Sequence, residues 1–272
     1  MNDILEMLRA KYHELNAAEQ KVARAVLDSA AAVQTMSISE LARAAKTSEA
    51  TVTRFCRRMG LTGFFALKLA LAKIGSVTEK VEDTGIAKKV AREGKNAIDS
   101  TLALLDGDEA LLQAVTMIER AEHVLAVGYG STSLIAAEFA NVFSTVSLKC
   151  SVVPDAHSQI ATVSLMTEKD LLILFSYSGS TLEGTELLRM AREKRIPTVL
   201  VTHFELSPSS KYADVVLYCG VDEHPYRVGS VPVRIAQMTL IDILFRTYEE
   251  RNRDVCEHGF DRVTDALATK HI

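Results

Sequence analysis

The sequence predicts two domains of different class, an all-α N-terminal domain and an α/β C-terminal domain with a doubly wound parallel sheet. Its 272 residues are 48% apolar and 24% charged, enough chain to bury a hydrophobic core in each of two domains. Residues 1–75 carry 11 Lys and Arg against 7 Asp and Glu, a net charge of +4, so the remainder carries −8. After about residue 120 the hydrophobic pattern changes from helical spacing to short apolar runs separated by helical segments.

Composition excludes several classes of protein. No window approaches the roughly 18 unbroken apolar residues of a membrane span, and the first residues lack the apolar core of a secretion signal. We therefore expect a cytoplasmic protein that does not associate with membranes. The four cysteines lie far apart without a CxxC or Cys/His pairing, so neither a disulfide framework nor a metal site is predicted.

Residues 1–75 are predicted to be helical throughout. Asn16 stands before one helix with Glu19 three positions on, the pattern of a capping box. Ser37 and Ser48 are the expected N-cap residues of the next two helices. Three further helices are predicted, at residues 38–45, 49–59 and 64–74.

The short helices at 38–45 and 49–59 have the size and the three-residue turn of a helix-turn-helix. In the second helix, one buried stripe at i, i+3, i+4 and i+7 comprises Val52, Phe55, Cys56 and Met59. The charged and hydroxyl residues that this stripe leaves on the exposed face and its flanks are Ser48, Glu49, Thr51, Thr53, Arg54, Arg57 and Arg58.

Those residue types suit the major groove of double-stranded DNA. Hydroxyls at a helix N-terminus can bond phosphates or base edges, and arginine can bind guanine in a bidentate manner, each good pair contributing about 1 to 3 kcal/mol of discrimination. Glu49 can accept from cytosine or simply favour the helix dipole. With Lys46, the seven residues are the predicted contacts to a DNA operator. The alternative is a small helical dimerisation domain with an incidentally basic helix.

A polar, poorly periodic stretch from Gly75 to Gly85 predicts a linker. The predicted domains are therefore a helix-turn-helix domain at 1–77, a linker and the start of a connecting helix at 78–95, and an α/β domain at 96–272. Helical spacing returns over 86–105 and 109–120, and a long helix is expected from about 231 to 250. Near-continuous apolar runs, which indicate strands buried on both faces, occupy residues 123–127, 148–153, 171–175, 198–201 and 215–218.

Two loops that follow predicted strands carry small and hydroxyl residues suited to an anion. Candidate ligand-binding residues in the first loop are Gly128, Gly130, Ser131, Thr132 and Ser133, and those in the second are Ser176, Ser178, Gly179, Ser180 and Thr181. Small residues let backbone amides approach a ligand, and the helix N-terminus adds partial positive charge. Neither loop has the lysine of a nucleotide-binding P-loop, so a phosphate monoester is the predicted ligand.

A dinucleotide site is an alternative for the first loop. Gly128 and Gly130 follow a strand and Asp155 comes later, as in a dinucleotide fingerprint. Ser133 nevertheless occupies the third glycine position, and a lone GxG is a weak signal. An NAD(H)-sensing repressor would also leave the serine-rich second loop unexplained. We therefore expect no cofactor.

Longer segments carry a family resemblance over nearly the whole chain. SYSGST after DLLILF, with VLAVGYGSTS, resembles the sugar isomerase (SIS) domain, and TVTRFCRRMGLTGFFALKLAL and VPVRIAQMTLIDILF resemble RpiR-type bacterial transcriptional regulators. The resemblance implies a DNA-binding repressor or activator whose SIS domain senses a phosphorylated sugar or sugar acid, usually as a homodimer or homotetramer. It matches the two loops to the ligand loops of the family, and Asp155, His157 and Arg234 to positions beside the ligand. Thr132 stands where the family often has serine.

The same fold also supports sugar-phosphate isomerases, so an isomerase with an accessory helical domain is a further alternative. That reaction needs a base near the substrate carbon, and the spacing of His157, Asp155 and Glu138 specifies no catalytic pair. The fused helix-turn-helix favours binding without turnover. The prediction is therefore a regulator and not an enzyme.

Overall fold

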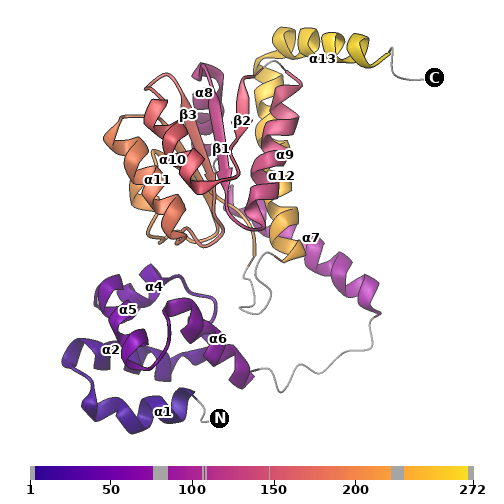
Figure 1. Ribbon diagram of the computed structural model, residues 1–272. Helices are drawn as coiled ribbons and strands as arrows, with labels where there is room; N and C mark the ends of the chain where they lie inside the picture. Colours follow the sequence, from indigo (N-terminus) through magenta and orange to yellow (C-terminus); the bar gives the residue numbers. More distant parts are fainter. Residues whose placement is uncertain are drawn as a thin grey trace. The chain divides into compact units, whose positions relative to one another are not determined.

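The computed structural model describes residues 4–75, 85–105, 107, 109–146, 148–221 and 230–268. The chain divides into two compact units, one containing the described residues up to Ala91 and the other most of those from Arg92 on (Figure 1). The first unit is helical and the second holds a parallel sheet, which confirms the predicted fold class. The predicted linker falls on residues 76–84, which lie outside the described residues.

The N-terminal unit begins its helices where the sequence predicts caps. Its elements are α1 (Ile4–Lys11), the 3-10 turn η1 (Tyr12–Glu14), α2 (Ala17–Asp28), α3 (Ala30–Val33), α4 (Ile38–Ala44), α5 (Glu49–Arg58) and α6 (Phe64–Gly75). Asn16 and Ser37 each close a capping box with the glutamate three positions on. Gly60 has a φ of 77°, a conformation that glycine adopts readily and that follows the end of α5.

Helices α4 and α5 form the predicted helix-turn-helix. The stripe of α5 is buried as expected: Val52, Phe55 and Cys56 are 0% exposed and Met59 is 3% exposed. It packs in one cluster with apolar residues of α2, α4 and α6. Because this contact sets the rotation of α5 about its axis, the opposite side of the helix faces solvent.

The C-terminal unit is built on a parallel sheet of order β2-β1-β3-β4-β5. Its strands are β1 (Val124–Gly128), β2 (Cys150–Val152), β3 (Leu171–Phe175), β4 (Thr198–Thr202) and β5 (Val215–Tyr218). Each predicted apolar run overlaps one strand, and β1 and β4 extend one residue beyond their runs, to Gly128 and Thr202. Strands β1, β3 and β4 are buried at every position, which explains why their apolar runs are unbroken.

Helices cover both faces of this sheet (Figure 1). The remaining elements are α7 (Ile86–Leu104), α8 (Glu109–Arg120), α9 (Thr132–Ser144), α10 (Ala156–Leu165), α11 (Leu182–Glu193), the 3-10 turn η2 (Ser210–Tyr212), α12 (Val231–Arg251) and α13 (Arg253–Ala268). Helices α8, α9 and α12 share one core with Val124 and Ala126 of β1, whereas α10 and α11 share the other with Leu125 and Val127. Within the described ranges, no helix is long and apolar enough to cross a membrane.

Helix α13 is absent from the sequence prediction. Only Cys256 and Gly259 of this helix are buried, so its apolar pattern is weak. A Cβ at Gly259 would lie 2.9 Å from the carbonyl oxygen of Thr145. Glycine therefore allows α13 to approach the C-terminal end of α9.

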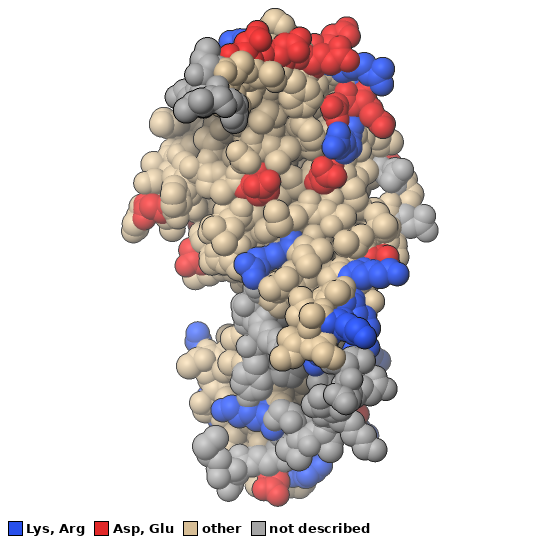
Figure 2. Space-filling model, turned by 90° about the vertical axis from the view of Figure 1, so that its right-hand side faces the viewer, with Lys and Arg blue, Asp and Glu red and all other residues tan. Residues whose placement is uncertain are grey.

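Helix α13, at that end of the unit, carries four exposed acidic residues and the two exposed arginines Arg253 and Arg262. Acidic residues exposed on α13 are Asp254, Glu257, Asp261 and Asp265, and Figure 2 shows acidic side chains gathered there. The carboxyl ends of the strands lie at the other end of α9, which is about 20 Å long for its 13 residues. At physiological ionic strength this separation exceeds two Debye lengths of about 8 Å, so the acidic end is largely screened from the strand ends.

Candidate functional site

The exposed side of α5 carries two of the arginines predicted to contact DNA. Arg54 and Arg57 are exposed, and Thr53 beside them is half-buried. Lys46 is exposed just before the helix and has a φ of 50°. The structure therefore brings three cationic side chains to the solvent-facing part of the helix-turn-helix.

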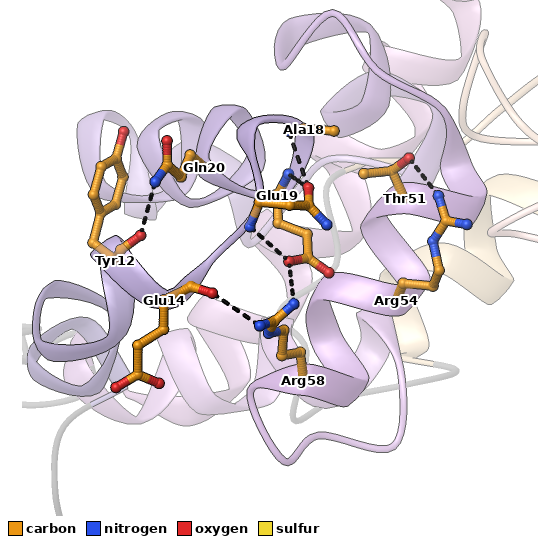
Figure 3. Close-up of polar contacts among 9 residues, drawn as sticks. Tyr12, Glu14, Ala18, Glu19, Gln20, Thr51, Arg54 and Arg58 are labelled. Atoms are coloured by element: carbon orange, nitrogen blue, oxygen red, sulfur yellow. Dashed lines mark hydrogen bonds and ion pairs between the residues drawn. The ribbon is translucent and has the colours of Figure 1, made fainter.

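The first turn of α5 is closed by its own side chains. Ser48 Oγ accepts from the Thr51 amide at 3.2 Å, and Arg54 Nη2 donates to Thr51 Oγ1 at 3.2 Å (Figure 3). Thr51 is only 5% exposed. Its position beside the buried stripe turns it inward, where its hydroxyl orients Arg54.

Glu49 connects the two helices of the motif. Its Oε1 accepts from Ser39 Oγ of α4 at 2.5 Å, and its backbone carbonyl accepts from Thr53 Oγ1 at 3.0 Å. The half-buried carboxylate therefore has a structural partner in addition to the favourable dipole at the start of α5.

Arg58, at the end of α5, bonds residues at and just before the start of α2. Its guanidinium donates to Glu19 Oε2 at 3.1 Å and to the Glu14 carbonyl oxygen at 2.8 Å (Figure 3). The same Glu19 oxygen accepts from the Asn16 amide at 3.2 Å in the capping box of α2. Arg58 thus connects the end of α5 to the start of α2, while half of its side chain stays exposed to solvent.

The two hydroxyl-rich loops meet at the carboxyl ends of β1 and β3. These strands are neighbours, and Gly128 at the end of β1 pairs in register with Phe175 at the end of β3. From β1 the chain continues to β2 on one side, and from β3 to β4 on the other, so the strand order reverses here. In open α/β sheets, ligands bind at such a switch point.

The first loop requires two glycines. A Cβ at Gly128 would lie 2.2 Å from the Thr132 carbonyl oxygen, and Gly130 has a φ of 59°. Thr132 is 8% exposed, and its hydroxyl accepts from the Tyr129 amide at 2.9 Å and donates to the Tyr129 carbonyl at 3.0 Å. This hydroxyl closes the loop. Ser133 Oγ donates to the Gly130 carbonyl at 2.7 Å.

The second loop is a tight turn lined by hydroxyls. Ser176 is 4% exposed, and its Oγ lies 3.5 Å from Thr181 Oγ1. Gly179 has a φ of 55° and its amide donates to the Ser176 carbonyl at 3.0 Å. Ser178 Oγ accepts from the Ser180 amide at 3.2 Å. The turn therefore gathers the hydroxyls predicted to bind phosphate.

The helices that follow both loops begin without a capping side chain. Ser131 precedes α9 and Thr181 precedes α11, yet among the described residues neither makes a side-chain cap bond. By contrast, Asn16, Ser37 and Asp155 each accept from an amide in the first turn of their helices. In the first turn of α9 the amides of Thr132 and Ser133 already donate to the carbonyl oxygens of Tyr129 and Gly130 at 3.3 and 3.2 Å. The uncapped start of α11, at the positive end of the helix dipole, can receive an anion.

The residues matched by resemblance to positions beside the ligand differ in setting. Asp155 caps α10, and the hydrogen bond that it accepts from the Ser158 amide at 2.8 Å lowers the pKa of its carboxyl. His157 is exposed in the first turn of α10. Arg234, in the first turn of α12, is half-buried, and its Nε is buried with no partner in the described part of the chain.

Sequence reasoning missed Tyr129 and Gln159, which support the first loop. The Tyr129 hydroxyl donates to Gln159 Oε1 at 2.6 Å, and Gln159 Nε2 donates to the Val153 carbonyl at 2.7 Å. Burial, helped by the Glu183 carboxylate, raises the pKa of Tyr129 to about 12, so its hydroxyl keeps its proton at neutral pH. The two residues lie 30 positions apart, so no local spacing indicates the contact.

Two family models match the chain. One is described as a helix-turn-helix domain of the rpiR family and matches residues 2–77, and the other is described as a SIS domain and matches residues 117–246. An uncharacterised HTH-type transcriptional regulator of Caldanaerobacter subterraneus is 31% identical over 281 residues, with 100% of this chain and 99% of the relative covered. HexR, an HTH-type transcriptional regulator of Pseudomonas aeruginosa, is 31% identical, with 90% of this chain and 88% of HexR covered.

Among the solved structures that match, some cover nearly the whole chain and others only part of it. NanR of Vibrio vulnificus, solved in complex with ManNAc-6P, has a TM-score of 0.90 and 26% identity, with 98% of this chain and 99% of NanR covered. A putative sugar-phosphate isomerase of Listeria monocytogenes has a TM-score of 0.56 and 20% identity, with 61% of this chain and 88% of that chain covered. The second match shows a shared fold alone.

Proposed function

The chain belongs to the rpiR family of helix-turn-helix transcriptional regulators that carry a SIS domain, and from this premise we propose that a phosphorylated sugar sets its affinity for an operator. The observation that carries the proposal is the pair of uncapped helix starts beside hydroxyl-lined loops at the switch point of the sheet. The ManNAc-6P bound to NanR supports this ligand class. The protein acts in the cytoplasm, and it binds its effector without turning it over.

On the DNA side, α5 enters the major groove. Arg54 and Arg57 are exposed on one side of the helix, where their guanidinium groups can bind guanine or phosphate. Lys46 contacts a phosphate, and the N-terminal half of α5, with Ser48, Glu49 and Thr53, faces base edges or phosphates. Arg58 and Thr51 hold this helix in place.

On the effector side, backbone amides and hydroxyls bind the phosphate group. The first-turn amides of α11 supply donors, as do the hydroxyls of Ser131, Ser178 and Ser180. Gly128, Gly130 and Gly179 allow the backbone to approach the ligand. The sugar portion then extends toward His157 and Arg234.

Control of DNA binding requires two coupled domains and more than one subunit. We place the helix-turn-helix domain at 1–77, the linker and start of the connecting helix at 78–95, and the SIS domain at 96–272. An operator with two half-sites needs two copies of α5, so the active form is a homodimer or homotetramer. The effector binds one subunit arrangement more tightly and thereby changes the separation of the helix-turn-helix units.

The test measures DNA and effector binding on the same variants. An operator is selected from random duplexes, and its affinity is measured by fluorescence anisotropy with ManNAc-6P and with a panel of hexose and sugar-acid monophosphates. We expect at least one compound to change operator affinity. Ser178→Ala should lose this response and keep operator affinity, and Arg54→Ala should show the converse. Ser164→Ala, at an exposed position of α10, is the matched control.

Three outcomes would contradict parts of the proposal. Equal loss of both functions in Ser178→Ala would contradict the separation of the two sites. A sugar phosphate that binds without changing operator affinity would contradict the coupling. Conversion of a bound sugar phosphate to its isomer, followed by NMR, would favour the isomerase alternative.

A further inference from the structure

Helix α12 buries a polar side chain that has no hydrogen-bond partner in the described chain. Gln237 is 1% exposed, and within the described chain neither its Oε1 nor its Nε2 has a hydrogen-bond partner. The Nε of Arg234, one turn earlier, is likewise buried and unpartnered. Burying such groups costs the hydrogen bonds that water makes with them in the unfolded chain, and native proteins pair nearly all of them. Two orphaned groups on one helix indicate that a polar partner belongs beside them.

This part of α12 lies next to the second loop. A Cβ at Gly220 would lie 3.7 Å from side-chain atoms of both Tyr177 and His203, and 4.0 Å from the Cβ of Ala236. Tyr177 belongs to the second loop, and its ring stacks on His203 with centroids 5.1 Å apart. Ala236 directly precedes Gln237, so the second turn of α12 is a close neighbour of the loop proposed to hold phosphate.

The same turn also lies level with the start of α9. Near the C-terminal ends of the two helices, the Phe143 ring contacts Phe245 and Tyr248 with centroids 5.4 and 5.6 Å apart. Both helices follow strands of the parallel sheet from its carboxyl edge, and they lie side by side in Figure 1. Eight residues earlier on each helix, a distance of about 12 Å, Gln237 is level with Ile135, one turn into α9. The orphaned amide therefore lies on the turn of α12 that is level with the start of α9 and that follows the neighbour of Gly220.

A second glutamine of the same unit shows the ordinary arrangement. Gln159 is also 1% exposed, but its Nε2 donates to the Val153 carbonyl at 2.7 Å and its Oε1 accepts from the Tyr129 hydroxyl at 2.6 Å. The fold thus supplies hydrogen-bond partners for the carboxamide of Gln159. The N–H donors and the carbonyl acceptor of Gln237 have no such partners within the described chain.

We propose that Gln237, with Arg234 Nε beside it, hydrogen-bonds hydroxyl groups of the sugar portion of the effector while the two loops hold its phosphate. This inference rests on the proposed function. A carboxamide has N–H donors and a carbonyl acceptor, which matches a hydroxyl that both donates and accepts. A phosphate dianion only accepts and would leave Gln237 Oε1 unpaired. Because a site built to bond a hydroxyl rejects analogues that lack it, Gln237 determines specificity for the sugar and not for the phosphate.

The test compares Gln237→Leu with Gln159→Leu, two substitutions that remove a buried amide at similar volume. In thermal unfolding without ligand, Gln237→Leu should unfold at the wild-type temperature or above, because it breaks no bond and removes an unpaired polar group. Gln159→Leu should unfold at a lower temperature, because Tyr129 and the Val153 carbonyl lose their partner. This opposite response separates a ligand-binding amide from one that the fold requires.

Calorimetric titration then uses inorganic phosphate and those compounds among ManNAc-6P and the hexose monophosphates that the wild type binds. Gln237→Leu should bind the sugar phosphate about tenfold more weakly and inorganic phosphate with unchanged affinity. Equal sugar-phosphate affinity in variant and wild type would overturn the inference and leave the proposed function standing. A large loss of stability in Gln237→Leu would also overturn it, since a water or protein group would then satisfy the amide. Absence of any sugar-phosphate binding by the wild type would remove the proposed function and this inference with it.

Discussion

Replacement of Arg58 by alanine should lower the stability of the N-terminal unit without removing a group that contacts DNA. The Arg58 guanidinium bonds both the Glu19 carboxylate and the Glu14 carbonyl, and it joins the end of α5 to the start of α2. The Glu19 side chain is 6% exposed and the Arg58 side chain is 50% exposed. Within the described chain, the substitution therefore leaves a nearly buried carboxylate with the capping-box amide of Asn16 as its remaining partner.

The expected loss of stability lies between the values for buried and for exposed ion pairs. Removing one partner of a fully buried pair costs about 3 to 5 kcal/mol, whereas exposed pairs contribute about 0.2 to 1 kcal/mol. Because one partner of this pair is half in solvent, we expect a loss of about 2 kcal/mol in the free energy of unfolding. For a domain of this size that loss lowers the unfolding temperature by about 8 to 16 °C.

Circular dichroism during thermal unfolding measures the loss, and a double-mutant cycle assigns it to the pair. Glu19→Gln, Arg58→Ala and the double variant should show a coupling energy of about 1 kcal/mol. Operator affinity, measured well below the unfolding transition, should stay within about threefold of wild type. The reasoning would be refuted by an Arg58→Ala variant with wild-type stability and greatly weakened operator binding, since Arg58 would then be a DNA contact.

Three further variants test other parts of the structure. Arg57→Ala should weaken operator binding and reduce its salt slope by about one with an unchanged unfolding temperature, as measured by anisotropy over a range of salt concentrations. Gly128→Ala places a Cβ 2.2 Å from the backbone oxygen of Thr132, so urea unfolding should show a loss of about 3 kcal/mol or more. Burial raises the pKa of the Cys56 thiol from 9.0 to about 12, so the protonated thiol favours folding fully below pH 9 and this stability declines as the pH rises toward 12. Urea unfolding at several pH values should show a shallower decline in Cys56→Ala, and an unchanged decline would contradict this assignment.

Local signals were sufficient for most of the fold. The capping boxes at Asn16 and Ser37 depend on a glutamate three residues away, so the printed sequence contains the whole interaction. The strands were equally visible, because helices on both sides of the sheet require unbroken apolar runs. Helix α13 lacked such a signal, since only Cys256 and Gly259 of this helix are buried.

The site was less predictable because distant residues decide what each polar group does. The spacing of the buried stripe on α5 identifies the opposite face, where Arg54 and Arg57 are exposed, but not the roles of flanking positions. Arg58 finds its partner Glu19 at a distance of 39 residues along the chain. In the SIS domain, the orphaned amide of Gln237 became evident only once its surroundings were known, because a glutamine in a helical pattern gives no indication of whether it is paired.

The two proposed anion sites rely on different chemistry, and salt dependence distinguishes them. The DNA-facing side of α5 presents formal charges on Lys46, Arg54 and Arg57, so operator binding releases counterions and weakens steeply as salt increases. The effector loops offer neutral amides and hydroxyls at two helix starts, and the acidic end at α13 lies about 20 Å away. Hydrogen bonds from neutral groups release fewer counterions than contacts between formal charges, so effector affinity should fall much less over the same range of salt. An equally steep fall would mean that a cationic side chain holds the phosphate, and Arg234 would then be the residue to replace first.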